Sequence, residues 1–123
     1  MRRSVFEYAV LRAVPHVERG ECVNVGVVLY CQALGFLATQ VHVDGDRLRA
    51  LDRDVDVDAV RSAAEALQRT CEGQGPAAAT SLGQRFRWLT APRSTVVHAG
   101  AVHTGLTDDP AADLVRLVQT LVR

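Results

Sequence analysis

The first third of the chain carries an arginine, a glutamate and an asparagine that together could form a small polar site. Arg12 lies near the end of one run of β-forming residues, Asn24 and Gly26 lie in the next such run, and Glu21 directly precedes that second run. Arginine, carboxylate and amide groups form charge-assisted hydrogen bonds. A glycine inside a strand leaves room for a ligand or a packed ring. These residues predict a binding site, and His103 is a candidate acid–base group if the fold brings it near.

The same residues also have a structural interpretation. A polar network can hold the loop 15–21 in place, because a buried amide must find hydrogen-bond partners. Either interpretation requires Arg12 and Asn24 on the same face of a hairpin. We expect the two strands to pair antiparallel with these residues opposite each other: Arg12 and Asn24, Val10 and Gly26, Tyr8 and Val28, Phe6 and Tyr30. The other face should then pack on a core, with Gly26 covered by a neighbouring group.

Cysteine and histidine chemistry has little support in the sequence. The three cysteines are odd in number and match no metal-binding spacing, so we interpret them as reduced thiols of a cytoplasmic protein. Cys22 could pair with His98 or His103 as an activated nucleophile, but no motif surrounds it. In a regular strand these two histidines point to opposite faces, because their separation is odd. We therefore expect no metal and no other cofactor.

The stretch "VHTGLTDDP" predicts the start of a helix. Thr107 and Asp109 can cap it, and Pro110 suits the first helical position, where a missing N–H costs nothing. The free N–H groups of such a helix end could instead bind an anion. Asp108 and Asp109 already occupy that positive end and would repel one. Capping is therefore the favoured interpretation.

The elements that must position these residues follow from local patterns. Short connections between β-forming runs predict antiparallel hairpins, whereas apolar residues at helical spacing predict two principal amphipathic helices. We expect strands over 5–14, 22–31, 34–43 and 94–103, helices over 57–71 and from Pro110 onward, a short helix within 82–92, and a loop over 72–81. The predicted fold is a single α+β domain over residues 1–123, with a four-stranded, mainly antiparallel sheet.

Composition excludes several classes of function. The 14 basic and 14 acidic residues balance, and aromatic residues make up only 5% of the chain, so a dedicated nucleic-acid-binding role is not expected. No apolar run approaches the length of a membrane span. All basic residues are Arg and there is no Ile, which is typical of a GC-rich bacterial genome.

Two runs of the sequence resemble the bacterial domain of unknown function 3037 family: "EYAVLRAVPHVERGECVNVGVVLYC" and "RFRWLTAPRSTVVHAGAVHTGLTDDP". The matching motif positions are Tyr8 and Arg12, then Glu21, Asn24 and Gly26, then His103, Gly105, Thr107, Asp109 and Pro110. The resemblance implies a compact bacterial cytoplasmic protein whose gene lies beside one for a HipA-like serine/threonine kinase. It implies no activity.

These observations favour an accessory or interaction protein that acts with a HipA-like kinase, or as a homo-oligomer. The alternative is a small enzyme or ligand-binding protein with its polar site at the first hairpin. A deep pocket lined by Arg12, Glu21 and Asn24 would favour the alternative. An exposed apolar surface would favour an interaction protein.

Overall fold

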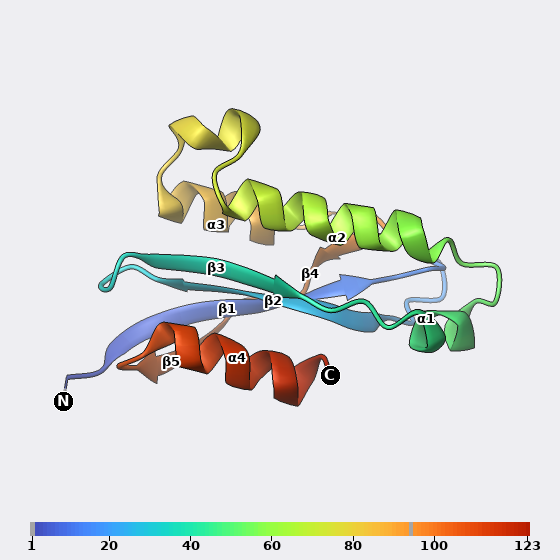
Figure 1. Cartoon of the computed structure of the whole chain (residues 1–123), viewed down its shortest axis with the longest axis horizontal. Helices are drawn as coiled ribbons and strands as arrows, with labels where there is room; N and C mark the ends of the chain where they lie inside the picture. The colour runs from blue at the N-terminus through green and yellow to red at the C-terminus, as the bar shows by residue number, and fades with distance from the viewer. Residues whose placement is uncertain (1, 94) are drawn as a thin grey trace.

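The computed structural model describes residues 2–93 and 95–123 and has a sheet of five antiparallel strands with helices on both faces (Figure 1). The strands are β1 (Ser4–Ala13), β2 (Val23–Cys31), β3 (Phe36–Val41), β4 (Val97–Ala99) and β5 (His103–Thr107). The helices are α1 (Gly45–Leu51), α2 (Val57–Cys71), the 3₁₀ helix η1 (Gly75–Ala79), α3 (Leu82–Thr90) and α4 (Pro110–Leu121). The predicted α+β class is confirmed.

Helices on both faces explain why the central strands are apolar on both sides. One core lies between the sheet and α2 with α3, and its largest fully buried members are Phe86, Leu11, Leu48, Leu89, Val25, Val28 and Val60. The second core lies between the sheet and α4 and contains Phe6, Val27, Leu29, Cys31, Leu114, Leu117, Val118 and Val122. In the described part of the chain, no helix is long and apolar enough to cross a membrane.

The sheet has five strands where the sequence predicted four. The predicted strand 94–103, whose first residue lies outside the described residues, is divided into β4 and β5. Both pair with β1: β4 with Leu11–Ala13 and β5 with Ser4–Tyr8. Residues 100–102 therefore stand opposite only two residues of β1, and the extra residue shifts the register and interrupts the strand.

The first hairpin contains a β-bulge that the sequence did not predict. Arg12 pairs with Asn24 as expected. The other three expected pairs are wrong, because Gly26 pairs with Leu11, Val28 with Ala9, and Tyr30 with Glu7. Val25 is the extra residue on β2, and its side chain is fully buried against the α2 and α3 core. The prediction assumed one buried face. With both faces buried, a bulge lets Val25 and Val27 enter different cores.

Candidate functional site

The structure keeps only part of the predicted polar site together. Arg12 and Asn24 are cross-strand neighbours and so lie on the same face of the sheet. The Asn24 Nδ2 group donates a hydrogen bond of 2.9 Å to the Leu121 carbonyl, which ties β2 to the end of α4. Glu21 does not join them, because its carboxylate accepts a hydrogen bond from Arg19 in the exposed loop.

Gly26 and His103 lie apart from Arg12. Gly26 pairs with Leu11 and so lies on the face opposite to Arg12. A Cβ atom at Gly26 would lie 2.7 Å from the Gln40 carbonyl oxygen, so the group that requires a glycine is the backbone of β3. His103 is exposed and pairs with Tyr8, which lies four residues along β1 from Arg12. The ring centroids of His103 and Tyr8 are 5.4 Å apart.

The predicted capping residues begin the last helix. The Asp109 carboxylate accepts a hydrogen bond of 3.2 Å from the Ala112 N–H, and Pro110 occupies the first turn. The Thr107 hydroxyl oxygen accepts a bond of 2.9 Å from the Asp109 N–H. These side chains therefore satisfy backbone donors at the helix start.

The cysteines differ in exposure. Cys22 is exposed, whereas Cys31 and Cys71 are buried. Burial raises the pKa of the Cys71 thiol, which disfavours the reactive thiolate. Among residues 2–93 and 95–123, no group of three or more His, Cys, Asp and Glu side chains is placed to hold a metal ion.

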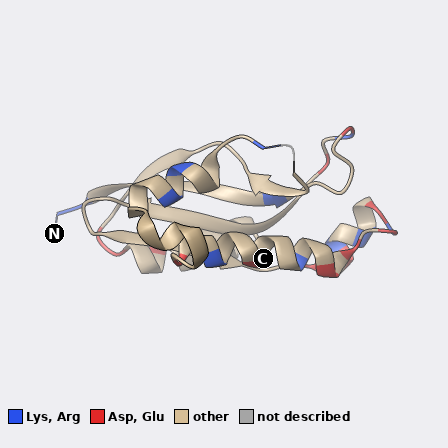
Figure 2. Cartoon of the chain, turned by 90° about the horizontal axis from the view of Figure 1, so that it is seen from above, with Lys and Arg blue, Asp and Glu red and all other residues tan. Residues whose placement is uncertain are grey.

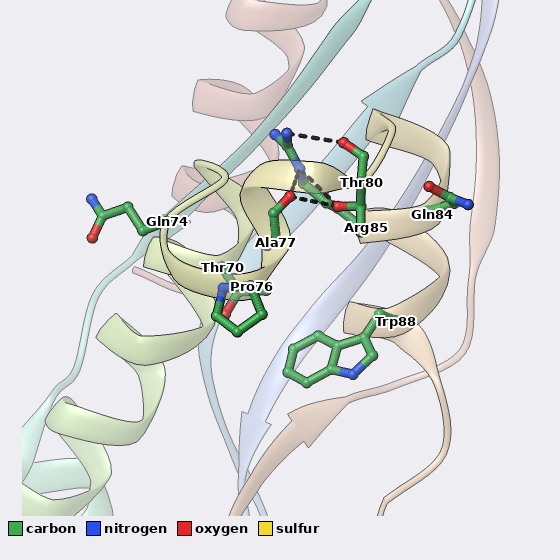
Figure 3. A pocket seen from close by; sticks show the side chains of 8 residues that line it. All are labelled: Thr70, Gln74, Pro76, Ala77, Thr80, Gln84, Arg85 and Trp88. Carbon is green, nitrogen blue, oxygen red and sulfur yellow. Dashed lines mark hydrogen bonds between the residues drawn. The ribbon is translucent and has the colours of Figure 1, made fainter.

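A groove lies between the end of α2, η1 and α3 (Figure 3). Its volume is about 430 Å³, and its walls are mostly apolar. The residues that line it are Thr70, Gln74, Pro76, Ala77, Thr80, Gln84, Arg85 and Trp88. In Figure 3, Pro76 comes from η1 and Trp88 from α3. This volume lies in the range of small-ligand and peptide side-chain pockets.

Local features of the sequence set the backbone path that forms this groove. Gly73 and Gly75 adopt positive φ angles of 82° and 67°, which turn the chain back after α2. Ser81 then starts α3 through a capping box, in which its hydroxyl accepts from the Gln84 N–H and the Gln84 side chain accepts from the Ser81 N–H. η1 is thereby held between the two helices.

Arg85 fixes the position of η1 against α3. Its Nε donates to the Ala77 carbonyl at 3.1 Å, and a terminal nitrogen donates to the Thr80 carbonyl, also at 3.1 Å. A Cβ atom at Gly73 would lie 2.9 Å from the guanidinium carbon, so a larger residue there would displace the Arg85 side chain from this position. Carbonyl oxygens orient this cation without neutralising it, and no carboxylate of the described residues forms an ion pair with it.

Trp88 forms the other wall and is the single tryptophan of the chain. Its side chain is 52% exposed. The guanidinium carbon of Arg93 lies 3.8 Å from the ring centroid, and Arg93 also donates a hydrogen bond to the Trp88 carbonyl. A half-exposed tryptophan held by a cation–π contact is a ready surface for an apolar group.

No acidic residue lines the groove, although Glu72 at the end of α2 accepts a hydrogen bond from the lining residue Gln74. Residues 73–107 contain no Asp or Glu but carry Arg85, Arg87 and Arg93. Of these, Arg87 is paired with Glu7 through hydrogen bonds of 2.8 and 3.2 Å, which raise the pKa of Arg87. Acidic side chains are concentrated at the other end of the molecule, around α1 and the start of α2 (Figure 2).

The sequence alone does not reveal the groove, because residues 72–81 have the composition of a loop. One sequence signal does point to this surface. In the predicted short helix, Leu82, Phe86 and Leu89 form the apolar stripe, and Trp88 lies outside it. A tryptophan off the buried stripe of a helix indicates a surface that binds something.

Comparison with known proteins places the chain in a family. Neither curated proteins nor solved structures give a match. The family described as "Protein of unknown function (DUF3037)" matches residues 8–122, which is nearly the whole chain and extends from within β1 to the end of α4. The chain therefore belongs to the DUF3037 family.

Proposed function

We propose that this protein is a bacterial cytoplasmic accessory protein that binds a partner protein through the groove between α2, η1 and α3. The observation that carries the proposal is the half-exposed Trp88 beside an apolar cavity of about 430 Å³. Tryptophan and arginine are the residues most enriched where binding energy concentrates in protein interfaces. Trp88 and Arg85 line this groove, and Arg93 stacks on Trp88.

Charge complementarity defines the partner segment. None of the lining residues is acidic, and Arg85 and Arg93 have no carboxylate partner among the described residues. A segment that places an apolar side chain between Pro76 and Trp88, with carboxylates beside it, complements this surface. The family resemblance points to a HipA-like serine/threonine kinase as the protein that carries the segment.

The alternative function is ligand binding or catalysis at the first hairpin. Of the residues predicted for that site, only Arg12 and Asn24 lie together, and neither lines the groove. One observation favours the alternative: the buried Arg12 Nε has no hydrogen-bond partner among the described residues.

Co-expression with the HipA-like kinase of the same genome tests the proposal. The tagged protein should retain the kinase through affinity purification, and Trp88→Ala should abolish retention. Leu34→Ala is the matched control, because Leu34 is 49% exposed in the β2–β3 turn, away from the groove. If the kinase is not retained at any salt concentration, the kinase proposal is wrong. If both variants retain it, the groove is not the binding surface.

A further inference from the structure

Arg12 lies in an unusual position for an unpaired cation. It belongs to the central strand β1 and has cross-strand neighbours on both sides, Asn24 on β2 and His98 on β4. Its guanidinium leans over β4: a Cβ atom at Gly100 would lie 2.8 Å from the guanidinium carbon and 3.1 Å from Nε. The absence of a side chain at Gly100 therefore creates the space in which the cation lies.

The guanidinium has no partner within the part of the chain that the structure describes. No carboxylate forms an ion pair with it, and its Nε is buried without a hydrogen bond. The amide of Asn24 is directed to Leu121 instead. An arginine Nε–H that is buried without an acceptor is costly, so this guanidinium favours contact with an acceptor group.

His98 supplies a second group on the same face. Its Nδ1 lies 2.8 Å from the Thr95 carbonyl oxygen. A carbonyl oxygen only accepts, so the proton is on Nδ1, and this bond fixes the ring. Nε2 is then the ring nitrogen left for a ligand. When protonated it donates to an anion, and when neutral it accepts from a protonated oxygen.

The face around these residues is open. Arg12, His98 and Gly100 are all partly exposed, and α4 covers β2 and β3 on this side of the sheet. The neighbouring segment 73–107 holds no carboxylate that could compete for the cation. The groove proposed for the partner protein is formed by α2, η1 and α3, on the opposite face.

We infer that Arg12 and His98 bind an oxyanion, a carboxylate or phosphate group, on this face of the sheet, with the guanidinium placed over Gly100. The two oxygens of such a group match the fork of N–H donors on a guanidinium. The site is independent of the groove, so it stands whether or not a partner protein binds there.

Titration of ¹⁵N-labelled protein with sodium acetate or inorganic phosphate tests the inference. The Arg12 Nε–H signal and the His98 ring signals should move and saturate at concentrations up to about 50 mM, the range of a weak single-anion site. If acetate saturates the signals at a lower concentration than phosphate, the site prefers a carboxylate; the opposite order indicates a phosphate site. A chloride titration at equal ionic strength corrects for screening.

Two variants and one control make the test specific. Arg12→Gln removes the charge. Gly100→Ala keeps the charge but displaces the guanidinium, and the fold should survive because the added methyl meets only the flexible end of Arg12. Both should weaken binding at least tenfold with a melting temperature near that of the wild type. Arg53→Gln removes the same charge from an exposed residue after α1 and should leave binding unchanged.

Several results would contradict the inference. The inference is wrong if neither anion saturates the wild-type signals, if Gly100→Ala binds like the wild type, or if Arg53→Gln loses as much affinity as Arg12→Gln. An unfolded Gly100→Ala protein would also contradict it, because Arg12 would then be a fixed part of the structure. If Arg12→Gln does not fold, the Gly100→Ala comparison decides.

Discussion

Asn24 shows how a residue with functional chemistry can have a structural role. Its amide crosses from β2 to the last turn of α4, and the Leu121 carbonyl that accepts from it belongs to a helix end with few other donors. The sequence predicted that Arg12 and Asn24 share a face, because both lie at the loop end of one hairpin. It could not predict that Glu21 turns to Arg19, since loop conformation depends on contacts that no periodic pattern encodes.

Asn24→Ala should lower the free energy of unfolding by about 1–3 kcal/mol, because the Leu121 carbonyl loses its donor. Asn24→Asp should cost a similar amount, since it keeps the shape but cannot donate. Chemical denaturation measures both. If stability stays at the wild-type value while kinase retention is lost, the residue is functional and the structural account of it fails.

Cys71 makes stability depend on alkaline pH. Burial raises the pKa of its thiol above the ordinary value of 9.0, so the folded protein holds the proton where the unfolded chain releases it. The stabilisation is complete below the ordinary pKa and is lost as pH rises through the folded pKa. Between about pH 7 and about pH 10, the wild type should therefore lose more unfolding free energy than Cys71→Ala. Equal losses in denaturant titrations at the two pH values would contradict this.

At the scale of elements, the longer helices are more predictable than strand boundaries, whereas the short helices α1 and η1 have no counterpart in the sequence prediction. The apolar spacing of α2 and α4 and the Asp109 cap are local features, so the sequence alone is sufficient to predict them. The division of 94–103 into β4 and β5 depends on register along β1, and the bulge at Val25 depends on a second helical layer. The groove depends on Arg85 holding η1, a contact between segments that local patterns treat separately.

Helix α4 provides a direct test of the second core. Leu117 is 6% exposed and packs among the residues of this core, so Leu117→Ala should cost about 2–5 kcal/mol of unfolding free energy. Val115 lies on the same helix but is 43% exposed, and Val115→Ala should change stability by no more than about 0.5 kcal/mol. A loss below about 0.5 kcal/mol for Leu117→Ala would mean that α4 does not pack on the sheet as described.

At the scale of the whole molecule, the net charge is zero but the acidic residues are distributed unevenly along the chain. Residues 44–72 hold eight of the 14 acidic residues, whereas 73–107 hold none. The two segments are neighbours, because α2 packs beside α3. Most acidic residues of the first segment lie around α1 and the start of α2, away from the groove (Figure 2). The groove therefore carries a local positive charge that attracts acidic partners, and added salt should weaken that attraction.

The single tryptophan allows the central claim to be tested in one spectrum. ¹⁵N-labelled protein gives one indole N–H signal, that of Trp88, and unlabelled HipA-like kinase adds none. We expect this signal to shift or broaden as the complex forms, together with backbone signals of η1 and α3, while those of α1 change little. If the complex forms and the Trp88 signal stays in place, the groove is not where the partner binds, and the account of this surface is contradicted.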